Sequence, residues 1–405
     1  MSVMRCGCLL LVFLLAACVS SSATPPPGEG GFMPPPRDAT LPPPLVWQEA
    51  TEEVTRANAA RLSLIGRLDS GGAPSTVFAA VFSPDSSRLA ALNNDQLLLW
   101  NLISGALVFN TARADAAAVY YSADKDEIYT LDSGGQIRIY DTDLGREKTS
   151  LPGQSAFNGV TAYDADKGWL ALAGADGTVK VWDVAARQSL VTINAHQNAI
   201  SALAFSADGE QLVTGDGINV RVWNWRTRQP VSSFEAPALR LVFSPDGTEV
   251  AVGEPQKITL WQVADGQLLH TLNTGVGGVL DVLRYAPDGQ FVLNGGAVPT
   301  LSLWDVASGL FVNALPDVGG DVVSAAFTPG GDLLATSTLG GAVTLWDAAT
   351  LRDKSLTRAD LPLNRQQVLS LDWSPDGYLL LLFDAQGAIE VWGIPAAPVT
   401  PTAVP

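Results

Sequence analysis

Residues 205–224 read Phe-Ser-Ala-Asp-Gly-Glu-Gln-Leu-Val-Thr-Gly-Asp-Gly-Ile-Asn-Val-Arg-Val-Trp-Asn. The stretch opens with an aromatic residue and a tight Ser-Ala-Asp-Gly turn, and two short apolar runs follow, the second of which ends at Trp223. Asp and Gly accommodate the bend of such a turn. Short apolar runs bounded by Gly, Asp and Asn are typical of buried strands. The stretch therefore predicts that one strand ends at Phe205 and that two more follow it.

The same pattern recurs along the chain in two series that run in step. The first series is an aromatic residue before a turn, found at Phe82, Tyr121, Tyr163, Phe205, Phe243, Tyr285, Phe327 and Trp373. The second is an aromatic residue near the end of an apolar strand, found at Trp100, Tyr140, Trp182, Trp223, Trp261, Trp304, Trp346 and Trp392. Successive members of the second series lie 38 to 46 residues apart. A period of about 40–45 residues with four short strands per unit is typical of β-propeller blades.

Three units end in the dipeptide Trp-Asp, and this detail resembles the WD-repeat family. The dipeptides are Trp182-Asp183, Trp304-Asp305 and Trp346-Asp347. The resemblance covers residues 62–394 and implies an all-β, eight-bladed β-propeller of four-stranded antiparallel blades. A seven-bladed ring with one degenerate unit set apart is the alternative.

The two ends of the repeat region complement each other. The last unit ends at Trp392, runs into Gly-Ile-Pro and lacks a fourth strand. The segment Leu62–Leu68 precedes the first complete unit and has the pattern of an outer strand. We therefore expect the N-terminal segment to complete the last blade and close the ring.

The N-terminus has the layout of an export signal. Arg5 precedes an apolar core from Leu9 to Leu15, which is too short to span a membrane as a helix. The ending Leu15-Ala16-Ala17-Cys18 resembles a bacterial lipobox. The resemblance implies that residues 1–17 are a signal peptide, removed by cleavage after Ala17, and that Cys18 carries a diacylglyceryl group and an acylated amino group. More than one acyl chain is the condition for stable anchoring.

The remaining segments flank the repeats. Residues 18–45 hold three Pro triplets, and such triplets favour an extended tether. Residues 46–61 have apolar side chains at helical spacing and predict a short helical lead-in. Residues 395–405 form a Pro-rich tail. We expect an exported protein that is lipid-anchored to a bacterial cell membrane and faces the periplasm or the cell exterior.

Charge and residue usage limit the possible chemistry. The chain carries 24 Lys plus Arg against 41 Asp plus Glu, a net charge of −17. Because an acidic surface repels phosphate backbones, we expect no nucleic-acid binding. All three cysteines precede residue 19, and the repeats hold only the histidines His196 and His270. We therefore expect no metal site, no cofactor and no catalytic residues.

One unit carries the full set of side chains that forms a hydrogen-bonded tetrad in the WD-repeat family. The resemblance assigns this structural tetrad to His196, Thr214, Asp216 and Trp223. Such a network satisfies buried polar groups and fixes the local geometry.

Charged residues lie on predicted innermost strands, where most units have Ala, Val, Leu or Ser. These residues are Arg240, Asp281, Arg284 and Asp372. They either pair across blades or line the central channel, where they could bind a small polar ligand.

Two further sets of residues are candidate partner contacts. The connection between residues 357 and 367 is the longest in the ring and holds Arg358, Leu361, Leu363 and Arg365. The other set is Trp225 with Arg226, in a basic spot on an acidic molecule, since Arg and Trp are common interface anchors.

These observations support three hypotheses about function. The first is a non-catalytic, membrane-anchored platform for other proteins, working as a monomer. The second is an envelope-assembly factor. The third is a small-ligand-binding or enzymatic propeller that uses its central channel.

Overall fold

The computed structural model describes residues 47–69, 76–112, 115–274, 280–296, 298–315, 320–352, 358–361, 368–384 and 387–396. The predicted signal peptide, Cys18 and the predicted tether lie outside these residues. Within them, no helix is long and apolar enough to cross a membrane.

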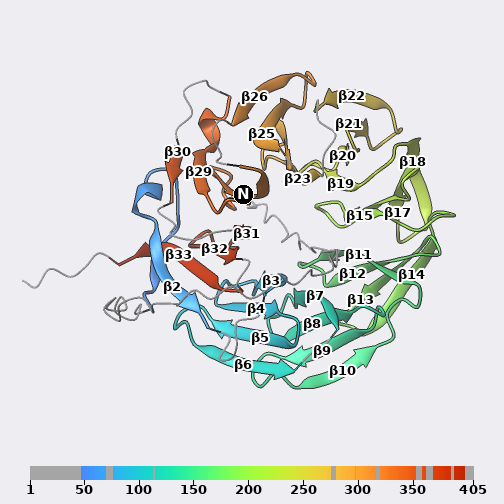
Figure 1. Cartoon of the computed structure of the whole chain (residues 1–405). Coiled ribbons are helices and arrows are strands. Elements are labelled where there is room, and N and C mark those ends of the chain that lie inside the picture. The colour runs from blue at the N-terminus through green and yellow to red at the C-terminus, as the bar shows by residue number, and fades with distance from the viewer. Residues whose placement is uncertain are drawn as a thin grey trace, which may run out of the picture.

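Eight antiparallel sheets are arranged around a centre as the blades of a propeller (Figure 1). The first two blades are β3 (Ala79–Phe82), β4 (Arg88–Leu92), β5 (Gln96–Asn101) and β6 (Leu107–Ala112), then β7 (Ala116–Tyr121), β8 (Glu127–Asp132), β9 (Ile137–Asp141) and β10 (Glu147–Leu151). The next two are β11 (Phe157–Asp164), β12 (Trp169–Gly174), β13 (Thr178–Asp183) and β14 (Gln188–Asn194), then β15 (Ala202–Phe205), β16 (Gln211–Gly215), β17 (Asn219–Asn224) and β18 (Gln229–Glu235).

The second half of the ring repeats this order. Blades five and six are β19 (Arg240–Phe243), β20 (Glu249–Gly253), β21 (Lys257–Gln262) and β22 (Leu268–Asn273), then β23 (Leu280–Tyr285), β24 (Phe291–Gly296), β25 (Val298–Asp305) and β26 (Phe311–Leu315). Blade seven is β27 (Val322–Phe327), β28 (Leu333–Thr338), β29 (Val343–Asp347) and β30 (Arg358–Asp360). Blade eight contains β31 (Val368–Trp373), β32 (Leu379–Asp384) and β33 (Ile389–Pro395). The predicted eight-bladed ring is confirmed, and the seven-bladed alternative is wrong.

In every blade the four strands are called a to d from the centre outward. Because consecutive strands are antiparallel, the a–b and c–d turns share one face of the ring, and the b–c turns and d–a connections share the other. We name these the a–b face and the b–c face.

Burial follows strand position within a blade. The b strands β8 and β32 are buried at every residue, whereas the d strand β6 alternates between partly exposed and exposed residues. Middle strands pack against neighbouring blades on both faces, so their sequences are continuously apolar rather than alternating.

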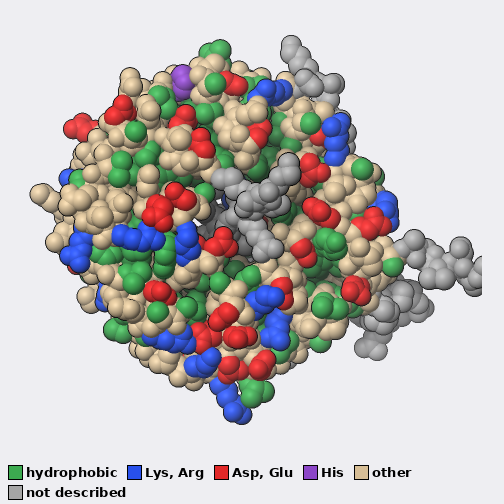
Figure 2. All heavy atoms as spheres, turned by 180° about the vertical axis from the view of Figure 1, so that it is seen from behind, with side chains coloured by type: hydrophobic (Ala, Val, Ile, Leu, Met, Phe, Trp, Pro, Cys, Tyr) green, Lys and Arg blue, Asp and Glu red, His purple; other side chains and the backbone are tan. Residues whose placement is uncertain are grey.

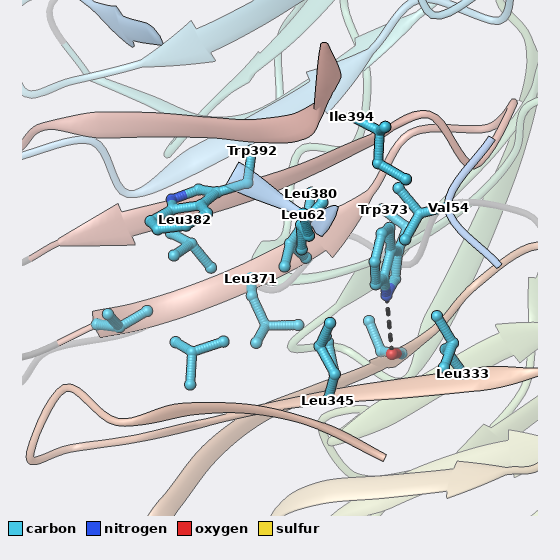
Figure 3. Packing of buried hydrophobic residues seen from close by; sticks show 14 residues of the cluster. Val54, Leu62, Leu333, Leu345, Leu371, Trp373, Leu380, Leu382, Trp392 and Ile394 are labelled. Carbon is cyan, nitrogen blue, oxygen red and sulfur yellow. Dashed lines mark hydrogen bonds between the residues drawn. The ribbon is translucent and has the colours of Figure 1, made fainter. Parts of the chain in front are cut away.

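The fourth strand of the last blade comes from the start of the repeat region. β2 (Ser63–Leu68) pairs antiparallel with β33, with Leu64 opposite Trp392 and Leu68 opposite Ile389. In Figure 1 this N-terminal strand lies beside the C-terminal one. Leu62, just before β2, packs in one core cluster with Trp373 and Leu345 of blades eight and seven (Figure 3). The first and last blades are therefore held together by strands from both ends of the described chain.

The predicted helical lead-in is wrong within its described part, residues 47–61. β1 (Ala50–Glu52) instead pairs with the end of β33, and only a 3-10 turn, η1 (Ala59–Arg61), follows. The other 3-10 turn of the described residues is η2 (Ala348–Thr350). The open edge at Ile394 and Pro395 offers the lead-in backbone hydrogen-bond partners, and this tertiary contact overrides local helix propensity. Pro395, predicted to begin the tail, is the last residue of β33.

The lead-in runs along the a–b face of three blades. Trp47 lies against Gly66 and Gly105, and its indole Nε1 donates to the Ile103 carbonyl at 2.9 Å. Farther along, Val54 is buried, and its amide donates to the Gly377 carbonyl at 2.9 Å. Arg56 then forms an ion pair with Asp347 of blade seven at 2.6 Å. The N-terminal segment therefore meets the ring on the a–b face.

Two c–d turns store backbone strain, because Arg187 in blade three and Arg228 in blade four both have a positive φ. Arg228 has a φ of 61°, in the position where the turns of other blades have Gly105, Gly145, Gly266 and Gly309 with positive φ. We expect Arg228→Gly to raise the free energy of unfolding by about 0.5–1 kcal/mol, because relief of the left-handed conformation exceeds the entropy that glycine adds to the unfolded chain. Urea unfolding checks this. The neighbouring Thr227→Gly variant lacks a positive φ to relieve and should be destabilised; a gain in both variants would contradict the account.

Candidate functional site

Three of the predicted tetrad side chains form a hydrogen-bond chain in blade four, and the fourth, Asp216, lies beside it. Trp223 Nε1 donates to Thr214 Oγ1 at 3.0 Å, and Thr214 Oγ1 lies 2.8 Å from His196 Nε2. His196 Nδ1 faces Asp216 Oδ2 at 3.4 Å. Burial lowers the pKa of His196 more than Asp216 raises it, so the imidazole is neutral near pH 7. A neutral ring accepts from Thr214 at Nε2 and presents its Nδ1 proton to Asp216.

The geometry of the four side chains indicates a structural role. The side chains of His196 and Asp216 are almost fully buried. The Asp216 carboxylate also accepts from the amides of Ile218 and Asn219 at 3.0 and 2.7 Å, which shapes the b–c turn. The four residues therefore fix blade four and its turn on the b–c face.

Other blades carry partial versions of this network that sequence reasoning missed. In blade three, Gln154 Nε2 donates to Thr178 Oγ1 at 2.6 Å, and Thr178 in turn donates to Asp176 at 2.6 Å. In blades six and seven, the Trp indoles donate to Asn294 at 2.7 Å and Thr336 at 2.9 Å. A polar residue on strand b, nine or ten positions before the strand c Trp, is the signal that marks Thr214, Asn294 and Thr336.

Removal of the central hydroxyl tests the tetrad. We expect Thr214→Val to lower the free energy of unfolding by about 2–3 kcal/mol, because it deprives both His196 Nε2 and Trp223 Nε1 of their partner without changing the volume much. Chemical denaturation measures the change. Thr214→Ser keeps the hydroxyl and should cost under about 1 kcal/mol; equal losses in both variants would show that the hydroxyl carries none of the effect.

The innermost strands define a layer of residues that lines the central channel. On strand a, the aromatic residue of the first series and the residue two before it pack between blades. The position one before the aromatic points to the other side of the strand and is partly exposed in most blades, at the inner edge that borders the channel. The layer one before the aromatic consists of Val81, Tyr120, Ala162, Ala204, Val242, Arg284, Ala326 and Asp372. All but Tyr120 and Ala326 are partly exposed.

Two members of this layer are charged and have opposite signs. Arg284 lies on β23 of blade six and Asp372 on β31 of blade eight, on either side of Ala326 in blade seven. Burial raises the pKa of Asp372 to about 6, although the positive charge of Arg284 lowers it in part. Arg240 begins β19 three positions before its aromatic residue and is partly exposed. Asp281 lies on β23, and its side chain is outside the described structure.

The raised pKa predicts a stability change with a defined sign. Because the folded chain binds the Asp372 proton more tightly than the unfolded chain, the carboxylate destabilises the fold above about pH 6, and this cost fades as pH falls toward 4. We expect Asp372→Asn to stabilise the ring by about 1–2 kcal/mol at pH 8, with the gain fading at pH 4. Unfolding measured at both pH values checks this. The exposed Asp95→Asn variant is the control, and an equal gain there, or one that grows in acid, would refute the expectation.

Trp225 was predicted as an exposed interface anchor, and this prediction is wrong. Its side chain is 2% exposed, and its Nε1 donates to the Gly209 carbonyl at 2.8 Å. The Trp169 ring packs edge-on at 5.1 Å between centroids. Arg226 stacks over both indoles, at 4.4 and 4.5 Å, and pairs with Glu210 at 2.7 Å. Trp225 is a core residue under the a–b face because its turn folds back onto blade three, which the local sequence does not reveal.

Part of the connection between residues 357 and 367 forms a strand. Arg358–Asp360 form β30, the outer strand of blade seven, with Arg358 opposite Trp346. Leu361 is partly buried against the core cluster that contains Leu345, and its amide donates to the Val343 carbonyl at 2.9 Å. Leu363 and Arg365 lie outside the described residues, as does the side chain of Arg358. The N–H and C=O groups on the outer edge of β29 require hydrogen-bond partners. Residues 358–360 supply them by pairing with β29 as a strand.

Exposed apolar side chains gather on the b–c face of blades four and five. Ile218, in the b–c turn of blade four, is 59% exposed, and Leu239, in the next d–a connection, is 51% exposed. The Ala236 amide donates to the Ile218 carbonyl at 3.0 Å and holds the two loops together. Pro237 between them is also exposed. Ile218, Pro237 and Leu239 form what we call the b–c apolar patch.

Charges elsewhere on the surface are mixed. On the face shown in Figure 2, basic side chains lie beside acidic ones, with apolar groups between them. Ion pairs such as Lys125 with Asp85 at 2.9 Å are examples of this mixing. Among the described residues, there is no group of three or more His, Cys, Asp or Glu arranged to hold a metal ion.

Comparison with known proteins agrees with this architecture. Residues 145–183, 187–224 and 315–347 match the family "WD domain, G-beta repeat". The chain is 31% identical over 193 residues to periodic tryptophan protein 2 of Arabidopsis thaliana, and the match covers 46% of this chain and 21% of that protein. It is 25% identical over 244 residues to serine-threonine kinase receptor-associated protein of Mus musculus, over 59% of this chain and 69% of the mouse protein.

Solved structures show the same fold. The computationally designed Ika8 protein superimposes with a TM-score of 0.66 at 22% identity, over 81% of this chain and 98% of the other. The C-terminal WD40 domain of Sif2 gives a TM-score of 0.65 at 14% identity, over 82% of this chain and 98% of that domain. The fold is therefore an eight-bladed β-propeller, and three of its segments are similar to WD repeats.

Proposed function

We propose that this protein is an exported, lipid-anchored and non-catalytic platform that binds another protein through the b–c face of its propeller. Relatives support the binding role, since one of them is named as receptor-associated. A rigid ring suits this role because it presents loops of fixed geometry and loses little entropy on binding.

The path of the lead-in is the observation that carries the proposal. Trp47, Val54 and Arg56 all contact the a–b face. Because the proposed tether would join the chain just before Trp47, these contacts support an anchor on the a–b side of the ring. The b–c apolar patch lies on the opposite face, where the anchor leaves it accessible to a partner.

The chemistry of the patch indicates what it would bind. Side chains of Ile218, Pro237 and Leu239 are apolar, and contiguous exposed apolar groups mark protein interaction sites. The partner would place an apolar side chain between the two loops, with polar contacts around it.

Site-specific photocrosslinking in the native membrane tests the binding face. A photoreactive residue at Leu239 should give a discrete crosslinked partner that disappears when Ile218→Asp is added. The same probe at Leu268, on the exposed outer strand β22, is the control. A partner captured equally from both positions, or unaffected by Ile218→Asp, would argue against the b–c face.

Metabolic labelling tests the anchor separately. An alkyne fatty acid should label the wild-type chain and the Cys8→Ser variant, but leave Cys18→Ser unlabelled and released from membranes. Label on the Cys18→Ser variant would refute lipidation at this residue.

A further inference from the structure

The channel layer contains a pair of unlike charges that do not bridge each other. Six of its eight positions are apolar or aromatic, and only Arg284 and Asp372 are charged. In the described structure, Arg284 makes no ion pair within 4 Å, and the one hydrogen bond of the Asp372 side chain is the 3.0 Å bond that Oδ1 accepts from the Trp373 amide. The positive charge of Arg284 acts on the Asp372 carboxyl, yet no ion pair within 4 Å joins the two side chains in the described structure.

This arrangement is costly without a partner. A guanidinium has five donors and a carboxylate about four acceptor sites, and both groups lose hydration inside a ring of Ala and Val side chains. Ala326, at the same position of the intervening blade, is buried in the core cluster of blades seven and eight and brings no polar group to either charge. Both residues are only partly exposed, so their hydration is reduced while a small solute can still reach them.

We propose that the central channel binds a small zwitterion, whose carboxylate contacts Arg284 and whose ammonium group contacts Asp372. An anion would be attracted by Arg284 but repelled by Asp372. A cation would be attracted by Asp372 but repelled by Arg284. A molecule with one group of each sign satisfies both side chains and adds no net charge to a poorly hydrated site. Both contacts are charge-assisted hydrogen bonds, the stronger class in proteins.

The site is independent of the partner surface. β23 and β31 lie at the inner edge of their blades, whereas the b–c apolar patch lies on loops of blades four and five (Figure 1). Loss of zwitterion binding would therefore leave the crosslinking result at Leu239 unchanged, and the two proposals can fail separately.

A series of ω-amino acids provides the probe. The full-length chain is titrated calorimetrically with glycine, β-alanine, 4-aminobutyrate and 6-aminohexanoate, each against its N-acetyl derivative. We expect one length to bind best, because only one spacing matches the gap between Arg284 and Asp372, and we expect acetylation to weaken binding at least tenfold. Equal heats for every zwitterion and its acetylated form would overturn the proposal.

Charge variants locate the binding site. Arg284→Gln and Asp372→Asn should each weaken the best zwitterion at least tenfold, whereas Arg228→Gln on the exposed c–d turn should bind it unchanged. The reciprocal double variant R284D/D372R reverses the polarity and should restore part of the affinity. Circular dichroism confirms that each variant is folded; folded single variants with wild-type affinity would place binding elsewhere and refute the assignment.

Discussion

Ile65→Asp is expected to destabilise the ring by more than about 4 kcal/mol and to expose both chain ends to protease. Ile65 on β2 is 0% exposed and packs in one cluster with Leu89 of blade one and Leu381 of blade eight. A carboxylate there would lose its hydration without any partner and would also remove the apolar contact between the first and last blades. Chemical denaturation and limited proteolysis measure the two effects.

Ser63→Asp is the matched control for this prediction. It introduces the same charge on the same strand at a partly exposed position opposite Gly393. We expect a loss below about 1 kcal/mol and no new cleavage near the chain ends. If the two variants unfolded at the same denaturant concentration, burial of β2 in the seam would not contribute to the stability of the ring.

Trp225→Ala is expected to cost about 3–5 kcal/mol, the range for removal of a large buried aromatic side chain. The substitution leaves a cavity beside Trp169 and removes the indole donor to the Gly209 carbonyl. Arg226 would also lose one of its two stacking partners. The denaturation midpoint gives the size of the loss.

The neighbouring Arg226→Ala variant separates core packing from surface charge. Arg226 is exposed and pairs with an exposed carboxylate on Glu210, so its removal should cost only about 1 kcal/mol. A larger loss for Arg226→Ala than for Trp225→Ala would reverse our assignment of the indole to the core.

The blades were predictable because they repeat. Each unit places an aromatic residue before a Ser-Pro-Asp-Gly type turn and another near the end of strand c, so eight weak local patterns reinforce one another. The lead-in occurs once and has no such support. The lead-in instead contacts the a–b face through two single side chains, Trp47 and Val54, on either side of the short strand β1.

The site was predictable only where residue type and spacing both constrain it. Strands b and c of blade four pair with Thr214 opposite Arg221. This register places the Thr214 hydroxyl within reach of both the Trp223 indole and the His196 ring. Trp225 could not be assigned from the sequence, because its burial depends on Trp169 in another blade. Gln154 escaped notice because an amide replaces the imidazole that the pattern leads one to expect.

Closure of the ring by β2 is the central claim, and paired cysteines at its register test it most directly. Arg67 lies opposite Glu390 in β33, and paired residues of antiparallel strands are about 4.5–5.5 Å apart at Cα, within the span of a disulfide. In a chain with Cys6, Cys8 and Cys18 replaced by Ser, Arg67→Cys with Glu390→Cys should oxidise to a disulfide detected by peptide mass, whereas Arg67→Cys with Lys180→Cys, the matching position of blade three, should not. Absence of the 67–390 link, or equal formation of the 67–180 link, would contradict the closed ring.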